Sequence, residues 1–268
     1  MDILYGLHPV EEALRSGSRK FDHLCIARER HDQRLQKIID AARESAVRLR
    51  FEPREELTRL ASTAAHQGVV AIVRTREFLG LEDLLASPEI SPQESPKPRL
   101  LLALDGIEDP QNLGALLRTA DASGVDGVVL TERRAAPLSP VAVKASAGAA
   151  EHVRIARVVN LVRALEQLKQ QNIWCVGLDE RGTTSYDQYD FTSNTVIVLG
   201  REGSGLHDLV RRTCDHLLSI PMAGGVSSLN VSAAGAVVLF EAARQRRAQS
   251  QTRPAEAAPR KKQKGLGS

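Results

Sequence analysis

The sequence predicts an α/β protein in which a parallel sheet carries helices on both faces and follows a smaller α/β module. From Arg99 onward, short apolar runs alternate with segments of helical periodicity, as expected for successive βα units. Hydrophobic residues make up 42% of the chain, but aromatic residues only 3%. A core built from Ala, Val, Ile and Leu is typical of helix-covered parallel sheets.

The composition excludes several classes of protein. At 268 residues, the chain has room for one large domain or two small ones. Its three cysteines (Cys25, Cys175 and Cys214) form no CxxC pair, so we expect neither a disulfide framework nor a metal site. The sequence shows no signal peptide and no apolar run of ~20 residues, so we expect a cytoplasmic protein without a membrane span.

The first 76 residues have the pattern of a small α/β module. Apolar runs predict strands over residues 22–27 and 68–74. Apolar residues spaced three and four apart predict helices over residues 9–14, 32–46 and 55–61.

A change of composition marks the end of this module. Residues 77–98 contain four prolines in the run LASPEISPQESPKP, and we interpret them as a semi-extended, weakly structured linker. The resulting division is a module over 1–76, a linker over 77–98, a main domain over 99–247 and a tail over 248–268. The tail is rich in Gln, Ser, Ala, Pro and basic residues, and we expect it to be disordered.

Positive charge is concentrated at the two ends of the chain. Residues 1–76 contain 14 basic and 11 acidic residues, and residues 244–268 contain eight basic residues and one acid. These two parts could hold a polyanion such as RNA. A solvated surface with a solubilising tail is the alternative that charge alone leaves open.

The main domain is expected to contain six strands and five helices. The strands are predicted over residues 100–104, 127–131, 153–158, 173–178, 195–199 and 216–220. The helices are predicted over residues 112–123, 139–147, 160–170, 205–214 and 230–247.

A first group of polar residues follows the strand at 100–104. Asp109 before Pro110 is typical of a turn, and Asn112 can cap the helix that follows. Arg118 lies one to two turns farther along, where a lone arginine is costly unless it is paired or faces a cleft. It could clamp a phosphate or bond to a structural carboxylate.

A second, glycine-rich stretch runs from Leu199 to Leu206. It follows a strand and precedes a helix, as a ligand loop does at the carboxyl edge of a sheet. Its spacing is not GxGxxG, which disfavours a dinucleotide site, and it lacks the Lys-Ser/Thr pair of a P-loop. Its acid, Glu202, would repel phosphates but would suit a hydroxyl or amine donor.

A third stretch, Ile220–Ala234, contains Pro221 and two adjacent glycines, which predict a fixed, tight backbone path. The polar side chains that follow, Ser228, Asn230 and Ser232, are all short. Such a loop suits a ligand that approaches the main chain closely. A glycine turn with a Ser/Asn helix cap is the alternative.

These three stretches follow predicted strands, and in an open α/β sheet the carboxyl ends of the strands converge. The polar residues collected there include no metal cluster and no Cys or His nucleophile; they are Asn112, Arg118, Glu202, Ser228 and Asn230. Such a set positions and polarises bound groups. It favours group transfer between two bound substrates, with orientation supplying much of the rate.

In order and spacing, the three stretches resemble the three motifs of the SpoU (TrmH) branch of the SPOUT RNA methyltransferases, from about Leu100 to Ala243. The segments Tyr5–Leu14 and His66–Ala71 resemble that family's amino-terminal substrate-binding domain, which is similar to the ribosomal-protein L30e fold. With this extension, the resemblance is greatest to enzymes that methylate the ribose 2′-oxygen of a guanosine in bacterial 23S rRNA.

The resemblance implies a trefoil knot in the carboxyl-terminal third that binds S-adenosylmethionine, and a homodimer with the site near the interface. The residues that would contact the cofactor, largely through main-chain atoms, are Gly200, Ile220, Met222 and Leu229. The residues that fall on the family's catalytic and substrate positions are Asn112, Arg118, Glu202, Ser228 and Asn230.

The implied reaction is an in-line attack of a ribose 2′-hydroxyl on the sulfonium methyl group. The family proposal makes Arg118 the base that draws off the hydroxyl proton, assisted by the substrate phosphate. Because a guanidinium has a pKa above ~12, the alternative is that Arg118 holds the phosphate and stabilises the developing alkoxide. Glu202 would fix Arg118 or substrate amino groups.

Two other functions remain open at this point. One is a methyltransferase that acts on tRNA, although the extra amino-terminal module disfavours it. The other is an RNA-binding ribosome-assembly protein without catalytic activity, which S-adenosylmethionine binding would exclude.

Overall fold

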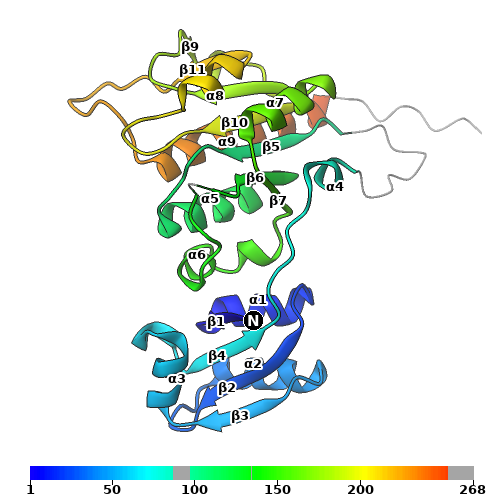
Figure 1. Cartoon of the computed structure of the whole chain (residues 1–268), viewed down its shortest axis with the longest axis vertical. Helices are drawn as coiled ribbons and strands as arrows, with labels where there is room; N and C mark the ends of the chain where they lie inside the picture. The colour runs from blue at the N-terminus through cyan, green and yellow to red at the C-terminus, as the bar shows by residue number, and fades with distance from the viewer. Residues whose placement is uncertain (87–96, 134, 253–268) are drawn as a thin grey trace, which may run out of the picture.

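Two sheets organise the chain in the computed structural model, which describes residues 1–86, 97–133 and 135–252 (Figure 1). The smaller sheet lies at the amino-terminal end of the molecule, and the larger sheet is formed by the residues that follow. No helix in these three ranges is long and apolar enough to cross a membrane.

The smaller sheet has four strands in the order β1-β4-β2-β3. Its strands are β1 (Asp2–Tyr5), β2 (Phe21–Ala27), β3 (Leu49–Glu52) and β4 (Val69–Val73). Its helices are α1 (Leu7–Ser16), α2 (Gln33–Glu44), α3 (Arg54–Ala61) and a 3₁₀ turn at Ala64–His66. The prediction missed β1 and β3, which are four-residue edge strands whose extended form depends on pairing with a neighbour.

The larger sheet confirms the parallel architecture, since each pair of neighbouring strands runs parallel. Its order is β7-β6-β5-β10-β8-β11-β9. Its strands are β5 (Leu100–Leu104), β6 (Gly127–Thr131), β7 (Ile155–Val158), β8 (Trp174–Leu178), β9 (Thr184–Ser185), β10 (Thr195–Leu199) and β11 (His216–Ser219). Only the two-residue β9 was not expected.

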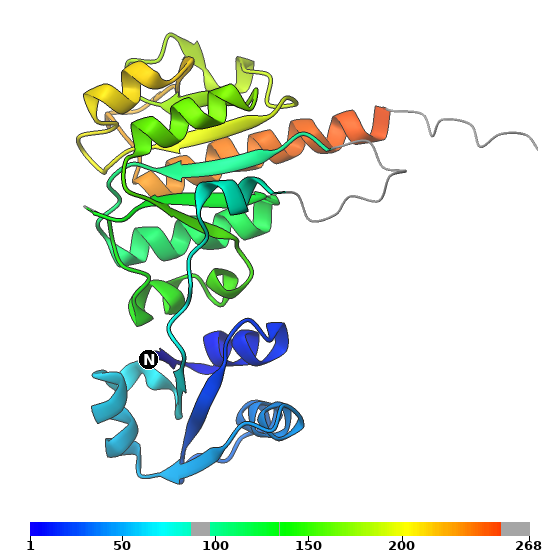
Figure 2. The same cartoon turned by 45° about the vertical axis from the view of Figure 1, so that its right-hand side comes forward.

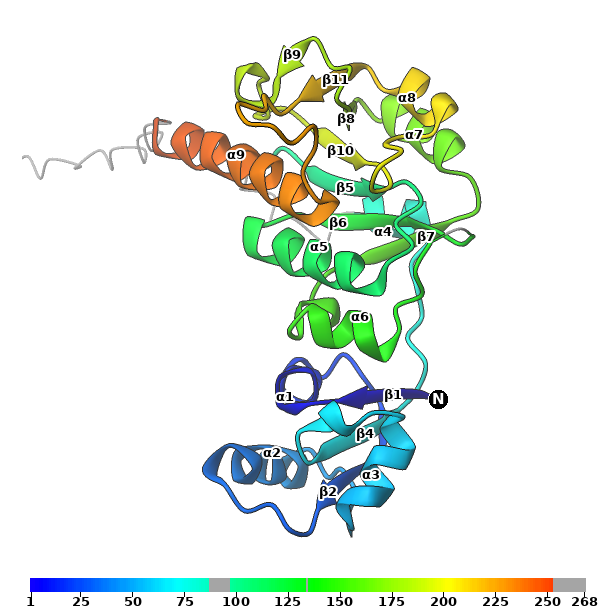
Figure 3. The ribbon, with the colours of Figure 1, turned by 90° about the vertical axis from the view of Figure 1, so that its left-hand side faces the viewer.

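Helices cover both faces of this sheet, as predicted. One face is covered by α5 (Pro110–Ser123) and α9 (Val231–Thr252), and the other by α4 (Leu81–Leu85), α7 (Leu161–Gln170) and α8 (Asp208–Thr213) (Figures 2 and 3). The short helix α6 (Pro140–Ala145) packs on α5 and lies between it and the smaller sheet. Two further 3₁₀ turns lie at Ala149–Glu151 and Tyr186–Gln188. Successive residues of β5 enter the two cores alternately, with Leu102 on the first face and Leu101 on the second.

Small residues let α5 approach its neighbours closely. A Cβ at Gly114 would lie 2.4 Å from the carbonyl oxygen of Ala142, which precludes a larger residue where α5 meets α6. A Cβ at Gly235 would lie 2.6 Å from Leu116, where α9 lies beside α5 (Figure 3). The contact at Gly235 places the first turns of α9 beside α5.

The expected linker differs from the structure over its first ten residues. Leu79 forms an isolated bridge with Ala156, and Leu81 and Leu84 of α4 are buried against the sheet. Residues 77–86 are therefore structured, because their apolar side chains find an uncovered part of a sheet face. Residues 87–96, which contain most of the prolines, lie outside the described residues.

The last helix also extends beyond its predicted end at residue 247. It continues to Thr252, so the tail is not irregular from residue 248. Arg246 ties the helix to the body of the domain by donating to the carbonyl oxygens of Phe191 and Arg99, each at 2.9 Å. The rest of the predicted tail, residues 253–268, is outside the described part of the chain.

A buried ion pair joins the two sheets. Arg19 Nε donates to Glu151 Oε2 at 2.8 Å, and these residues are only 7% and 5% exposed. Ser18 Oγ donates to the same carboxylate oxygen at 2.8 Å, and Arg19 also donates to Asp2 at 3.1 Å. Arg76 donates to the carbonyl oxygen of Val153 at 2.7 Å. These contacts fix the smaller sheet against the 3₁₀ turn that precedes β7.

Glu151→Ala should lower the unfolding free energy by about 3 kcal/mol, because it leaves the Arg19 guanidinium buried with only Asp2 as a charged partner. A lower midpoint of thermal or urea unfolding would measure this loss. Glu44→Ala is the matched control, since Glu44 is exposed and forms no ion pair with any residue that the structure describes. It should change stability by less than about 0.5 kcal/mol. Equal midpoints for the two variants would contradict the structural role of Glu151.

Candidate functional site

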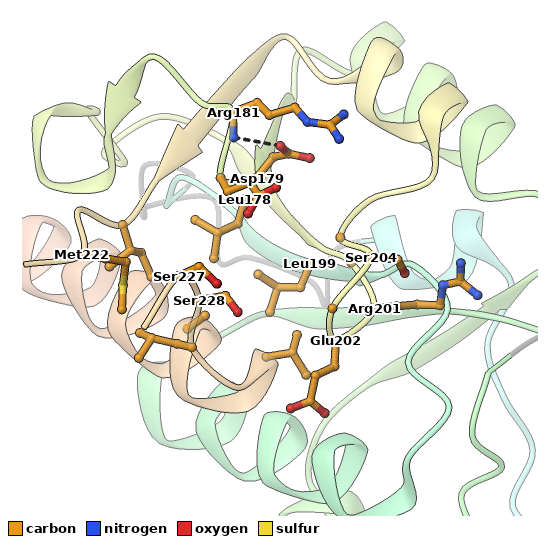
Figure 4. Close-up of a pocket in the computed structure, with 18 residues that line it drawn as sticks. Leu178, Asp179, Arg181, Leu199, Arg201, Glu202, Ser204, Met222, Ser227 and Ser228 are labelled. Atoms are coloured by element: carbon orange, nitrogen blue, oxygen red, sulfur yellow. Dashed lines mark hydrogen bonds between the residues drawn. The ribbon is translucent and has the colours of Figure 1, made fainter. Parts of the chain in front are cut away.

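A cavity of about 340 Å³ opens at the carboxyl ends of β8 and β10 (Figure 4). This volume is typical of a small-molecule site. Its walls come from the ends of these strands, from the loop 200–206 and from the segment between β11 and α9. The predicted residues that line it are Gly200, Glu202, Ile220, Met222, Ser228 and Leu229.

Two further predicted residues, Asn112 and Asn230, bind the lining residue Glu202. Asn112 Nδ2 donates to Glu202 Oε2 at 3.2 Å, and Asn230 Nδ2 donates to Glu202 Oε1 at 3.2 Å. Asn230 Nδ2 also donates to Asn112 Oδ1 at 3.0 Å. The three side chains come from three stretches of sequence up to 118 residues apart. They form a connected polar cluster at one end of the cavity.

The residue that caps α5 differs from the prediction, and this difference places Asn112 in the cluster. Asp109, and not Asn112, caps α5, since its carboxylate accepts from the Gln111 N–H at 3.0 Å. Pro110 then occupies the first turn of the helix, where its missing N–H costs nothing. Asn112 is thereby left within the first turn, 8% exposed, with its side chain free to bind Glu202.

Asn230 caps α9 and also belongs to the polar cluster. Its Oδ1 accepts from the Ser232 N–H at 2.9 Å and from the Ser232 hydroxyl at 2.6 Å, so it caps α9. Its Nδ2 meanwhile donates to Glu202. The Glu202 carboxylate therefore lies next to residues at the beginnings of both α5 and α9, whose positive dipole ends favour an anion.

Arg118 lies apart from this cluster. Its side chain is exposed on α5, while Leu116 and Leu117 face the core. Within the described ranges it forms no ion pair or hydrogen bond, so the interpretation of a buried arginine bonded to a structural carboxylate is wrong. Glu202 binds the two asparagines and makes no contact with Arg118.

The glycine-rich loop closes upon itself. Arg201 and Gly205 exchange backbone hydrogen bonds of 3.0 and 2.9 Å. A Cβ at Gly200 would lie 2.2 Å from the carbonyl carbon of Gly205, so this position requires glycine for the loop to fold. Figure 4 shows the Arg201 side chain extending away from the cavity.

The paired glycines of the third stretch behave differently. Gly224 and Gly225 have no positive φ, and a Cβ at either would meet nothing within 4 Å. Residues 223–229 are exposed and form no hydrogen bond with the described part of the chain. The prediction of a fixed, tight path is therefore wrong, because no neighbouring segment constrains this loop within one copy of the chain.

The prediction missed residues that follow β8 and β5. Asp179 lines the cavity at the end away from Glu202 and accepts from the Arg181 N–H at 3.0 Å (Figure 4). Asp105 is 4% exposed and accepts from the His207 N–H at 2.7 Å, which anchors the end of the glycine-rich loop. The rule that strand ends converge would have identified Asp179, because a strand was predicted to end at residue 178.

The chemistry available at this site is binding and orientation. The carboxylates of Asp179 and Glu202 favour a ligand that carries O–H or N–H donors or a positive charge. Burial raises the pKa values of the Cys175 and Cys214 thiols to about 12, so neither forms a thiolate near neutral pH. Among the described residues there is no group of side chains that could hold a metal ion.

Two family models match this chain. The model described as "SpoU rRNA Methylase family" matches residues 99–240, and the model described as "RNA 2'-O ribose methyltransferase substrate binding" matches residues 3–79. The two matches cover the larger and smaller sheets respectively.

Curated relatives are similar over nearly their full length. The chain is 42% identical to the 23S rRNA (guanosine-2'-O-)-methyltransferase RlmB of Pseudomonas syringae pv. tomato, over 92% of this chain and 97% of that protein. It is 41% identical to the protein of the same name from Escherichia coli K12, over 91% and 99% of the two chains.

Solved structures show the same architecture. The SpoU methyltransferase AviRb from Streptomyces viridochromogenes, in complex with the cofactor AdoMet, matches with a TM-score of 0.77 at 26% identity, over 92% of this chain and 90% of that one. The Aquifex (A. aeolicus) TrmH/SpoU tRNA modifying enzyme matches with a TM-score of 0.53 at 30% identity, over 59% of this chain and 83% of that one.

Asn230→Ala should destabilise the protein by about 1–2 kcal/mol, because it removes the cap of α9 and both donors to its neighbours in the polar cluster. Asn160→Ala is the matched control. Asn160 caps α7 by accepting from the Arg163 N–H at 3.1 Å and lies outside the cluster. It should cost about 1 kcal/mol. Thermal unfolding of both variants measures the difference, and a smaller loss for Asn230→Ala would be inconsistent with its double role.

Proposed function

Because the chain belongs to the SpoU rRNA methylase family, we propose that it transfers the methyl group of S-adenosylmethionine to the ribose 2′-hydroxyl of a guanosine in 23S rRNA. The observation that carries this proposal is the cavity at the ends of β8 and β10, which the second and third motif stretches line and which the first reaches through the hydrogen bond from Asn112 to Glu202. Relatives with this name are similar over more than nine-tenths of both chains.

The residues of the cavity fit the proposed cofactor. The ligand has an adenine ring, ribose hydroxyls and an amino acid group, and it supplies an electrophilic methyl group on a positively charged sulfur. Leu199, Ile220 and Leu229 offer an apolar surface for the ring. Asp179 and Glu202 offer acceptors at the two ends, and backbone groups of the loop 200–205 are accessible beside them.

Arg118 is suited to hold an RNA phosphate. It is exposed and has no partner within the described ranges, so its charge is free for an anion. The phosphate-holding role needs no deprotonation, whereas the role of base requires a guanidinium with a pKa above ~12 to lose its proton. The ribose would be oriented by Ser228 and by the polar cluster of Asn112, Glu202 and Asn230. The three side chains of this cluster already hold one another in place.

The alternative of a tRNA enzyme is less well supported. The A. aeolicus tRNA modifying enzyme covers 59% of this chain, whereas the 23S rRNA relatives also cover the amino-terminal module. The alternative of a non-catalytic protein is opposed by the intact polar cluster and by Arg118 and Ser228. Mapping 2′-O-methyl groups in 23S rRNA and tRNA with and without the gene distinguishes the three functions.

We also propose that the protein is a cytoplasmic homodimer and that its carboxyl-terminal third forms the trefoil knot implied by the resemblance. In support of a dimer, Val226 in the loop before α9 is 63% exposed and Phe240 on α9 is 46% exposed. A second copy of the chain would cover these apolar side chains. Sedimentation equilibrium measures this assembly directly.

Arg118→Ala should abolish methyl transfer to 23S rRNA, with a loss of at least ~100-fold in rate, and leave S-adenosylmethionine binding unchanged. The physical reason is that the variant removes the charge proposed to hold the phosphate at the target nucleotide. S-adenosylmethionine binding is unaffected because Arg118 does not line the cavity. Methyl incorporation and calorimetry measure the two effects. Arg163→Ala, on the exposed side of α7, is the control and should keep full activity. Full activity of Arg118→Ala would refute both proposed roles of this residue.

Gly200→Ala should weaken S-adenosylmethionine binding at least ~10-fold, because its Cβ cannot fit beside Gly205 and the loop must open. Gly224→Ala is the matched control, since its Cβ would meet nothing within 4 Å, and it should bind normally. Calorimetric titration with S-adenosylmethionine compares the two variants. Normal binding by Gly200→Ala would show that the loop 200–205 does not shape the cofactor site.

A further inference from the structure

A second cavity, of about 430 Å³, lies between the two sheets and is referred to here as the inter-sheet cleft. Its walls are the turn between α1 and β2, the segment after β4, and the beginning of β7. The side chains that give it charge are Arg19, Lys20, Arg74, Arg76, Arg154 and Glu77. Five basic groups and one carboxylate thus line the cleft, and two further carboxylates, Asp2 and Glu151, pair with Arg19.

Two of these cations are structural. Arg19 is buried and pairs with Glu151 and Asp2, and the Arg76 guanidinium donates to the carbonyl oxygens of Ala150 and Val153. Their hydrogen bonds join the two sheets and hold the two arginine side chains in place without a ligand. Because Glu151 and Asp2 carry as much charge as Arg19 and Arg76, these four groups add no net positive charge to the cleft.

The other cations are available to a ligand. Lys20 and Arg74 are exposed, and their side chains form no ion pair or hydrogen bond within residues 1–86, 97–133 and 135–252. Their backbones pair with each other, since the Arg74 N–H donates to the Lys20 carbonyl at 2.8 Å, so the two side chains start from adjacent positions. Among the described residues, Arg154 donates to the carbonyl oxygens of Asp83 at 2.7 Å and Ala86 at 3.5 Å.

The cleft lies far from the methyl-transfer cavity along the sheet. It borders the beginning of β7, whereas the cavity opens at the ends of β8 and β10. In the sheet order, β7 is three strands from β10. Three strand spacings of about 4.8 Å and a strand length of about 15 Å separate the two sites by about 20 Å. One nucleotide cannot reach both, but a folded RNA can.

We propose that the inter-sheet cleft binds the sugar–phosphate backbone of the RNA substrate, with Lys20 and Arg74 as the phosphate contacts and Arg154 beside them. This inference rests on the proposed function for the identity of the polyanion. The cleft adds affinity for a large RNA and takes no part in the reaction. It also explains why the two sheets are joined by a buried ion pair: the phosphate site requires both sheets in a fixed relation.

The test is the salt dependence of RNA binding by Lys20→Ala/Arg74→Ala. The matched control is Arg163→Ala/Arg212→Ala, which removes the same charge from exposed, unpartnered positions on α7 and α8 within the described ranges. The probe is an unmodified 23S rRNA transcript. Binding is measured by filter retention from 0.05 to 0.5 M KCl, and S-adenosylmethionine binding by calorimetry.

For the cleft variant, we expect the slope of log K against log[KCl] on the transcript to fall by about 1–2. This change corresponds to about 10–100-fold weaker binding near 0.1 M salt. The control variant should lose less than about threefold, and both variants should bind S-adenosylmethionine like the wild type.

Two results would overturn the proposal: an unchanged slope for the cleft variant on the transcript, or an equal loss for the control variant. Failure of the proposed function is separate. It would appear as a wild-type protein that binds the transcript but does not methylate it.

Discussion

The parallel pairing of β10 with both β5 and β8 is the constraint on which the rest of the structure depends. Residues 195–199 are buried and pair in register with residues 100–104 on one side and 174–178 on the other. Three strands therefore end together at one edge. The segments that carry Asn112, Asp179 and Glu202 begin at this edge. Asn112 therefore meets Glu202, and Asp179 faces the same cavity from its other end, although the three are distant in sequence.

Close approach by small residues completes this arrangement. Gly114 and Gly235 allow α6 and α9 to lie against α5, and Gly200 allows the glycine-rich loop to fold onto itself. The beginnings of α5 and α9 consequently flank Glu202, whose two oxygens accept from Asn112 and Asn230. The carboxylate is held in one orientation by neutral donors, which leaves the positive charge of Arg118 free for a substrate.

The basic side chains fall into two groups: those bonded inside the protein and those available to a ligand. Arg19, Arg76 and Arg246 are used inside the protein, where they bond to a carboxylate or to carbonyl oxygens and join segments that are distant in sequence. Lys20, Arg74 and Arg118 are exposed and have no partner among the described residues. Net charge alone cannot make this distinction, because it depends on which acceptors folding brings within reach.

Local patterns in the sequence determined much of this protein. The apolar runs at 100–104, 127–131 and 195–199 are strands with the predicted bounds, because each contains at least four consecutive buried residues. The second and third motif stretches also line one cavity, and the first is joined to it by the hydrogen bond from Asn112 to Glu202, as the convergence of parallel strands predicts. The edge strands β1, β3 and β9 could not be predicted, since each is extended only through pairing with a neighbour.

Tertiary structure alone decided which partner each polar residue has. Asp109 takes the cap that Asn112 was expected to provide, and Asn112 can then bind a carboxylate 90 residues away. Arg118 is exposed because the buried face of α5 is already filled by leucines. The pairing of Arg19 with Glu151, 132 residues apart, has no signature in local periodicity. Such contacts depend on how elements pack in space, and a sequence pattern reports only which face of each element is apolar.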